Sequence, residues 1–249
     1  MTELNKKLRR KIIDLLFKHN ACHLGSCMSC VEILSALYFE IMEDEDKFIF
    51  SKGHAAAALY TVLSEKGIIN WDELHEKYYE QGGEYWGLAH HTVPGVILST
   101  GSLGHGLPVA CGISLVSKGK VYCLLSDGEL DAGTTWESAL FASHNKLSNL
   151  TVLIDYNKLQ AFGKTNEVLN LEPLTKKWES FGWDVKEVDG HDFEELVSAL
   201  ENISSDEKPH VIICHTIKGK GISFAENKLE WHYYNLTPEL YEKAKNDLR

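Results

Sequence analysis

The sequence has no apolar run that approaches the roughly 18 residues a helix needs to cross a bilayer. Its first residues, MTELNKKLRRKIIDLL, alternate charged and aliphatic side chains, so they lack the basic and then apolar segments of a secretory leader. A hydrophobic content of 44% over 249 residues still provides one substantial buried core. These features exclude a membrane-spanning protein, and we expect a cytoplasmic one.

Positive charge is also scarce in this chain. Lys and Arg number 25 against 36 Asp and Glu, which gives a formal net charge of -11. A nucleic-acid surface needs clustered Lys and Arg, and the one short basic stretch, residues 6–11, is expected to be a solvated helix face. The composition therefore argues against a nucleic-acid partner.

Cysteine is too sparse and too scattered for a disulfide framework. Three of the six cysteines lie inside apolar runs, where a thiol behaves as a small hydrophobe. One group, Cys22, His23, Cys27 and Cys30, has a spacing that roughly suits zinc. The competing interpretation is a His followed by a turn of small residues and a helix.

No Pro/Ser-rich linker, internal repeat or low-complexity tract divides the chain, so we expect one domain over residues 1–249. Short apolar runs alternate with stretches whose apolar residues recur three and four positions apart. This alternation predicts an α/β fold, a parallel sheet with helices on both faces. The predicted helices cover residues 3–19, 29–42, 53–66, 71–79, 104–118, 134–146, 174–181 and 193–202; the predicted strands cover 48–50, 120–125, 150–155, 183–188 and 210–216; residues 82–101 form a long loop.

Polar residues come just after several of these strands. In open parallel sheets ligands gather at the carboxyl ends of the strands, so such residues are expected to share one edge. They are Asp127, Asn157, His191 and Lys218.

Two of these strand ends have the chemistry of a magnesium site. Asp127 and Asn157 offer hard oxygen ligands, and Mg²⁺ usually completes its octahedron with substrate phosphates and water. Gly128 would let the backbone approach a diphosphate closely. The alternative is an ordinary βαβ unit with a polar turn.

The pattern resembles the thiamine diphosphate signature, written GDG, a spacer and then NN. Ser126 and Tyr156 depart from it, whereas Asp127, Gly128 and Asn157 are kept. Further segments resemble the N-terminal half of transketolase, in the same order along the chain: residues 21–34, FSKGHAAAALY (50–60), STGSLGHGLPVACG (99–112), and HTIKGKG (215–221) with EWH (230–232). The resemblance implies the thiamine diphosphate-binding fold, here its pyrophosphate-binding domain, and the transfer of a two-carbon ketol unit.

The resemblance also implies roles for individual residues. It implies that Mg²⁺, or Ca²⁺ or Mn²⁺ in its place, is held by Asp127, Asn157 and the Leu159 carbonyl. It implies that phosphate oxygens or the adjacent channel are met by Lys52, His54, Lys218 and His232, with Gly128 and Glu129 in the metal motif. It implies that the rest of the cofactor and the sugar hydroxyls are met by Gly101, Leu103, His23 and Ser26.

Two features depart from the family pattern. The family carries a His in the loop before STGSLG, and a gap-free count places Leu88 there, so His90 or His91 takes that catalytic role only if the loop is shifted. A Glu that the family uses in a network between active sites is replaced by Ala132, although Glu137 keeps a second network position.

Transketolases continue with a pyrimidine-binding domain, whereas this sequence ends at Arg249. The resemblance therefore implies the N-terminal subunit of a split transketolase, completed by a C-terminal subunit in an α₂β₂-like assembly and acting on sugar phosphates. The alternatives are the α subunit of a 2-oxo acid dehydrogenase, deoxyxylulose phosphate synthase, and a non-catalytic subunit that keeps the fold.

Overall fold

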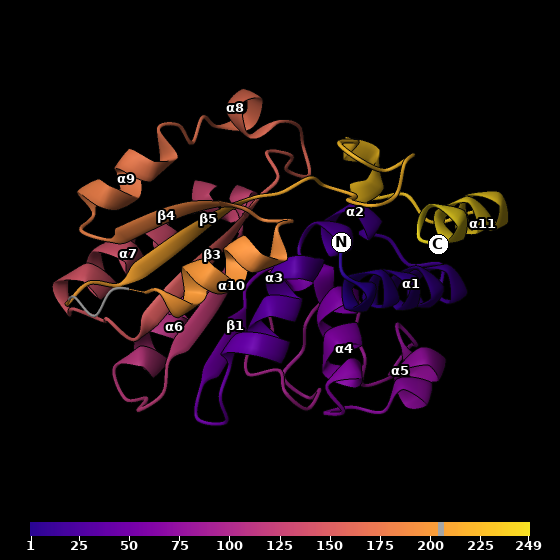
Figure 1. The fold of residues 1–249 in the computed structure, drawn as a ribbon, viewed down its shortest axis with the longest axis horizontal. Helices are drawn as coiled ribbons and strands as arrows, with labels where there is room; N and C mark the ends of the chain where they lie inside the picture. Colours follow the sequence, from indigo (N-terminus) through magenta and orange to yellow (C-terminus); the bar gives the residue numbers. More distant parts are fainter. Residues whose placement is uncertain (204–206) are drawn as a thin grey trace.

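The centre of the computed structural model is a parallel sheet, and the structure describes residues 1–203 and 207–249 (Figure 1). Its five strands lie in the order β1-β2-β3-β5-β4. They are β1 (Lys47–Phe50), β2 (Val121–Ser126), β3 (Leu150–Tyr156), β5 (His210–His215) and β4 (Asp184–Asp189). All neighbouring pairs are parallel, so every strand ends at the same edge of the sheet. The predicted strands are confirmed to within two residues.

Side chains along each strand alternate between two cores. In β2, Tyr122 and Leu124 join the larger core, whereas Val121, Cys123 and Leu125 join the core on the opposite face. Helices cover both faces, as predicted, because strands buried on two sides need apolar cover on each. The larger core includes residues of α1 (Glu3–Lys18), α2 (Leu24–Ser29), α3 (Val31–Ala36), α4 (Ala56–Glu65) and α10 (Phe193–Glu201); the other includes residues of α6 (Gly106–Ser114), α7 (Gly133–His144) and α9 (Leu174–Ser180).

The helix predicted over 29–42 is wrong in extent. The helical chain starts earlier, with α2 at Leu24, breaks at Cys30, continues as α3 and ends in a π-helical turn, Leu37–Ile41. Small residues favour a turn by local propensity, but packing overrides propensity here. A side-chain carbon on Gly25 would lie 3.1 Å from Lys218 Cγ, and the Gly25 carbonyl accepts a hydrogen bond from the Gly219 N–H at 2.9 Å.

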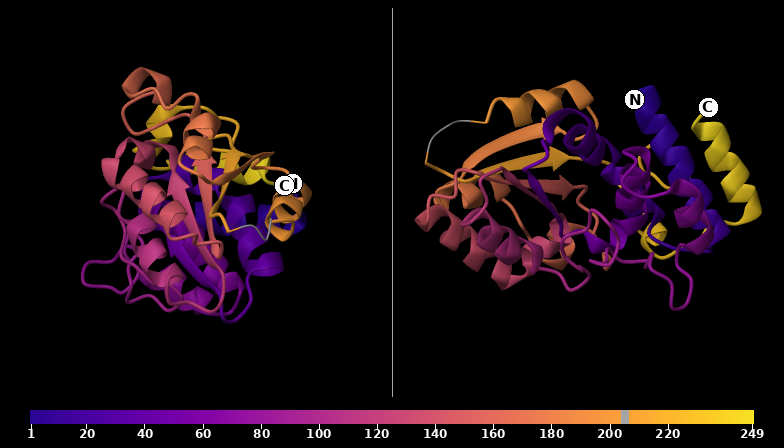
Figure 2. Two further views of the ribbon diagram at one scale, coloured as in Figure 1. Left: turned by 90° about the vertical axis from the view of Figure 1, so that its left-hand side faces the viewer. Right: turned by 90° about the horizontal axis from the view of Figure 1, so that it is seen from below.

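The two ends of the chain lie side by side, with α11 (Pro238–Asp247) against α1 (Figure 2). The Phe17 and Tyr241 rings stack at 4.2 Å, and the Tyr241 hydroxyl donates to Asp14 at 2.6 Å. The sequence prediction contained no helix here, although the Thr237 hydroxyl caps a helix that starts with proline. Two shorter helices complete the fold, α5 (Trp71–Lys77), which was predicted, and α8 (Thr165–Val168), which was not.

None of the helices in the described ranges combines the length and apolar character that a membrane crossing requires.

Candidate functional site

Loops from distant parts of the chain meet at the carboxyl edge of the sheet around a cavity of about 290 Å³. Strand register brings them together, because Ser126 of β2 lies beside Asp155 of β3, and Asp155 lies beside Cys214 of β5. Most of the predicted site residues line this one cavity. They are His23, Ser26, Lys52, His54, Gly101, Leu103, Asp127, Gly128, Asn157, Leu159, Lys218 and His232.

The three residues predicted to bind the metal line the same cavity. Asp127 is buried, and its carboxylate accepts hydrogen bonds from the backbone N–H groups of Gly128 at 2.8 Å and Lys158 at 2.6 Å. The Asn157 side-chain oxygen accepts the Leu159 N–H at 3.1 Å, and the Leu159 carbonyl accepts the Lys218 ammonium at 3.0 Å. Burial, with the nearby charge of Asp155, raises the pKa of Asp127 to about 6.

This donor set fits a hard divalent cation. A carboxylate, an amide oxygen and a carbonyl are ligands that Mg²⁺ accepts, and a cation would stabilise the charged form of a carboxylate that burial disfavours. A glycine suits position 128, because a side-chain carbon there would lie 3.2 Å from Cγ of Gln160, which also lines the cavity. By contrast, no cluster of three or more His, Cys, Asp or Glu suited to a metal occurs in the described residues, so the zinc interpretation of Cys22, His23, Cys27 and Cys30 has no support.

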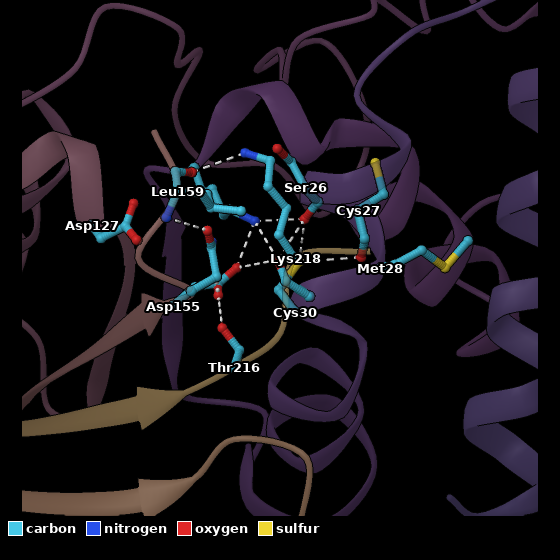
Figure 3. Close-up of polar contacts among 12 residues, drawn as sticks. Ser26, Cys27, Met28, Cys30, Asp127, Asp155, Leu159, Thr216 and Lys218 are labelled. Atoms are coloured by element: carbon cyan, nitrogen blue, oxygen red, sulfur yellow. Dashed lines mark hydrogen bonds and ion pairs between the residues drawn. The ribbon is translucent and has the colours of Figure 1, made fainter. Parts of the chain in front are cut away.

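Lys52 does not carry a free charge toward the cavity. Its ammonium forms a fully buried ion pair with Asp155 at 2.6 Å and donates to the Ser29 hydroxyl at 3.0 Å. Asp155 also accepts from the Ser29 and Thr216 hydroxyls, and Figure 3 shows Thr216 next to the carboxylate. Lys52 thus lines the cavity as expected, and its partner within the protein is Asp155.

Three histidines form a cluster on the cavity wall. The ring centroids of His23 lie 5.6 Å from His54 and 5.0 Å from His232. Burial, followed by the positive charge of Lys218, lowers the pKa of His23 to about 4 and that of His232 to about 3. Burial and then Lys52 lower the pKa of Lys218 to about 8. The imidazoles are thus neutral near pH 7 and can both donate and accept hydrogen bonds.

An NMR titration of the cofactor-free protein should show that both imidazoles stay neutral until the pH approaches about 4 for His23 and about 3 for His232. The control is the urea-unfolded chain, whose histidines should titrate near the ordinary value of 6.5. Because the unfolded state takes up these protons first, the contribution of these two imidazoles to stability should fall as the pH drops below 6.5. Folded midpoints near 6.5 would contradict the assigned environment.

Three predicted residues do not line this cavity. Glu129 is fully buried behind it, where its carboxylate accepts from the Gly104 N–H at 2.9 Å and from the Ser51 hydroxyl. A cofactor contact by Glu129 is therefore wrong in this structure.

The loop histidines also point elsewhere. His90 Nδ1 lies 2.9 Å from the Thr92 hydroxyl, and His91 Nδ1 lies 2.7 Å from the Ser99 hydroxyl. Leu88, the position given by the gap-free count, lines the cavity and His90 and His91 do not, so the structure gives no support to a catalytic role for either histidine.

His191 lies at the predicted edge but borders neighbouring cavities. Its Nδ1 lies 3.0 Å from Glu32, which forms a buried ion pair with Arg9 at 2.6 Å, and its Nε2 accepts the Ile217 N–H at 2.7 Å. His191 therefore fixes the backbone immediately before Lys218.

Sequence analysis missed several lining residues. Gln160 and Phe162 follow the metal motif on the same loop, and the Gln160 amide donates to Asp131 at 2.8 Å. Their closeness to Asn157 in the sequence could have identified them. Ala161 also lines the cavity, together with Ser126 and Leu88, which the sequence analysis named as departures from the family pattern.

A parallel α/β sheet whose strand ends gather a carboxylate, an amide, a lysine and neutral histidines around one cavity defines a protein of the class that binds a ligand at the carboxyl edge of its sheet. Residues 2–248 match the family model described as "Transketolase, thiamine diphosphate binding domain". The chain belongs to the transketolase family.

Relatives that cover nearly the whole chain are named as subunits. The chain is 44% identical to a subunit of the apulose-4-phosphate transketolase of Actinobacillus succinogenes, over 93% of this chain and 90% of that protein. It is 37% identical to a 6-deoxy-6-sulfo-D-fructose transketolase subunit of a Clostridium species, over 97% of this chain and 93% of that protein. These relatives identify it as a transketolase subunit, part of a transferase.

Solved structures show the same fold. The transketolase of Campylobacter jejuni superposes with a TM-score of 0.90 at 26% identity, over 98% of this chain and 42% of that one. A Pichia stipitis transketolase in complex with fructose 6-phosphate superposes with a TM-score of 0.91 at 25% identity, over 99% of this chain and 41% of that one. The chain therefore spans about two fifths of these longer proteins.

Proposed function

We propose that this chain is the diphosphate-binding subunit of a two-chain transketolase that moves a two-carbon ketol unit from a ketose phosphate to an aldose. The observation that carries the proposal is the convergence of Asp127, Asn157, the Leu159 carbonyl, Lys218 and the histidine cluster on one cavity. These groups together offer oxygen ligands for a cation, positive charge for a diphosphate and neutral imidazoles for sugar hydroxyls.

We propose Mg²⁺ as the metal, with Ca²⁺ or Mn²⁺ able to replace it, held by Asp127, Asn157 and the Leu159 carbonyl. Thiamine diphosphate, when bound, supplies the nucleophilic carbon to which the two-carbon unit is transferred. Lys218 adds positive charge at the diphosphate. The backbone at Gly101 and the side chain of Leu103 would meet the remainder of the cofactor.

The protein's part in the proton steps falls to the neutral histidines. His23 and His232 can donate to or accept from a sugar hydroxyl near neutral pH, because burial holds their pKa values low. The Ser26 hydroxyl lies 3.4 Å from His232 Nδ1 and helps to orient that ring. Lys52 serves this site indirectly in the proposal, by neutralising Asp155 next to the metal ligands.

We propose that a separate C-terminal subunit supplies the pyrimidine-binding domain, in an α₂β₂ assembly. Support comes from relatives of similar length that are themselves named as transketolase subunits, since each matches this chain over 90% of its own length. The substrates named for the relatives, apulose 4-phosphate and a sulfonated fructose, are ketoses with an anionic group, so we propose a donor of that class.

The organisation and compartment of the chain are part of the proposal. We propose that residues 1–249 form one domain, because both cores pack against the same sheet. We propose a cytoplasmic location, because all six cysteines are free thiols and five are buried.

The test is reconstitution with the candidate C-terminal chain, thiamine diphosphate and Mg²⁺. We expect aldehyde release from a ketose phosphate, with transfer to ribose 5-phosphate, only when both chains are present. Each chain measured separately is the control. Full turnover by this chain alone would defeat the two-subunit proposal, and pyruvate decarboxylation by the mixture would instead support the 2-oxo acid dehydrogenase alternative.

A further inference from the structure

A second cavity of about 350 Å³ adjoins the cofactor cavity. The two share His23 and Leu88 as wall residues, so the second cavity continues the first. None of its wall residues is a Lys, Arg, Asp or Glu, and the low pKa of His23, about 4, leaves that imidazole uncharged near neutral pH. We call it the aromatic cavity; it is lined by Ala21, Cys22, His23, Tyr78, Tyr79, Trp86, Gly87 and Leu88.

Packing holds two sides of the aromatic cavity in place. Tyr78 is buried, and its ring stacks on Tyr79 with centroids 6.0 Å apart. The Tyr79 N–H donates to the Tyr85 carbonyl at 2.7 Å, which ties residues 78–79 to the segment that carries Trp86. Glycine is needed at 87, because a side-chain carbon there would lie 2.3 Å from the Tyr79 ring.

Leu88 forms the boundary between the two cavities. Its carbonyl accepts the hydroxyl of buried Tyr60 at 3.0 Å, which fixes the backbone, while the residue is 42% exposed and lines both cavities. A side-chain carbon on Gly101 would lie 3.0 Å from Leu88 Cδ1, so the isobutyl group packs over that glycine. A leucine offers no hydrogen bond to a hydroxyl group. A substrate carbon facing it is therefore favoured when it carries hydrogen or an alkyl group.

We propose that the aromatic cavity is a substrate-specificity subsite that receives a hydrocarbon part of the substrate, a methyl, methylene or other carbon without a hydroxyl group. This inference rests on the proposed function. In a ketol transfer the aldehyde released from the donor and the aldehyde that accepts the unit occupy the same place. The aromatic cavity therefore selects acceptors and donor remainders alike, while His23 meets the oxygen atoms on its open side.

The experiment compares two acceptors of nearly equal size, propanal and glycolaldehyde, which differ by a methyl group in place of a hydroxyl. With the reconstituted enzyme we expect kcat/KM for propanal to exceed that for glycolaldehyde by about tenfold or more, the discrimination typical of an apolar pocket. Leu88→His should bring the ratio toward one by offering the hydroxyl a partner. Trp86→Ala should reduce it by removing one apolar wall.

Ile97→His is the matched control, because Ile97 lies in the same loop, is 41% exposed and lines neither cavity. The ratio of kcat/KM for propanal to that for glycolaldehyde in Ile97→His should equal the ratio in the unmodified enzyme. A ratio near one before mutation, or one unchanged in both Leu88→His and Trp86→Ala, would overturn the proposal. If Trp86→Ala instead weakens binding of the second subunit with the ratio unchanged, the cavity is a docking surface and the subsite is refuted.

Failure of the subsite is distinguishable from failure of the proposed function. Absence of ketol transfer to ribose 5-phosphate or to either small aldehyde would contradict the proposed function. Transfer to both small aldehydes at equal kcat/KM would contradict only the subsite. Circular dichroism and thiamine diphosphate affinity of each variant show whether its fold is intact.

Discussion

Asp155→Ala should lower the free energy of unfolding by about 3–5 kcal/mol, because it leaves the Lys52 ammonium buried without its anion. The ion pair spans 2.6 Å with both side chains at most 1% exposed. The substitution also removes the acceptor of the Ser29 and Thr216 hydroxyls. Urea unfolding monitored by circular dichroism measures the change.

A surface ion pair gives the control. Lys146 and Glu207 are 62% and 76% exposed, so Glu207→Gln should change the free energy of unfolding by no more than about 1 kcal/mol. A double variant, Lys52→Met with Asp155→Leu, should recover most of the lost stability, since an apolar pair needs no desolvation. Equal effects of Asp155→Ala and Glu207→Gln would contradict the buried pair.

The pH dependence of the pair has a defined sign. Burial opposes the charged form of Asp155, but Lys52 and the hydroxyl donors outweigh it and lower the pKa below 3.8. Its stabilisation is therefore complete above the unfolded value of 3.8 and is lost as the pH falls through the lower folded value. Asp155→Ala should lose this acid-dependent part of the unfolding curve.

The strands and most helices could be predicted because their apolar spacing matches their burial. Val121 to Leu125 is a continuous apolar run, and Leu150 to Ile154 is apolar except for Thr151, which is the pattern of a strand buried on both faces. Once the strands were placed, the parallel arrangement determined that Asp127 and Asn157 would meet at one edge.

The errors in the sequence prediction occur where tertiary contacts, and not the local sequence pattern, determine what a side chain touches. Asp155 sits inside an apolar run, and only the fold shows that Lys52 and Ser29 meet it from elsewhere in the sequence. Glu129 is two residues from Asp127, but the 3₁₀ turn of Asp127–Asp131 points its side chain toward Ser51 and Gly104. The separation of these residues along the sequence does not show which groups Asp155 contacts or which way the Glu129 side chain points.

Asp127→Asn should abolish metal-dependent binding of thiamine diphosphate and remove the pH dependence that the Asp127 carboxyl gives to the stability of the cofactor-free protein. The variant keeps the side-chain shape but removes the charge that would attract the cation. Isothermal titration of thiamine diphosphate with Mg²⁺ into the reconstituted enzyme measures the loss. The control, Asp189→Asn, changes a carboxylate that also lies at a strand end but borders the neighbouring cavities, and its affinity should be unchanged.

The stability half of this prediction follows from the raised pKa of Asp127. The folded protein holds the proton up to about pH 6, whereas the unfolded chain releases it near 3.8. The contribution of the Asp127 carboxyl to the stability of the metal-free protein therefore falls as the pH rises from 3.8 toward 6, by on the order of 2–3 kcal/mol, and that part of the pH dependence should be absent from Asp127→Asn. Unfolding in urea at pH 4 and pH 7 separates the two proteins. Unchanged cofactor affinity would refute the metal assignment, and parallel pH dependence would refute the buried, uncompensated carboxylate on which that assignment rests.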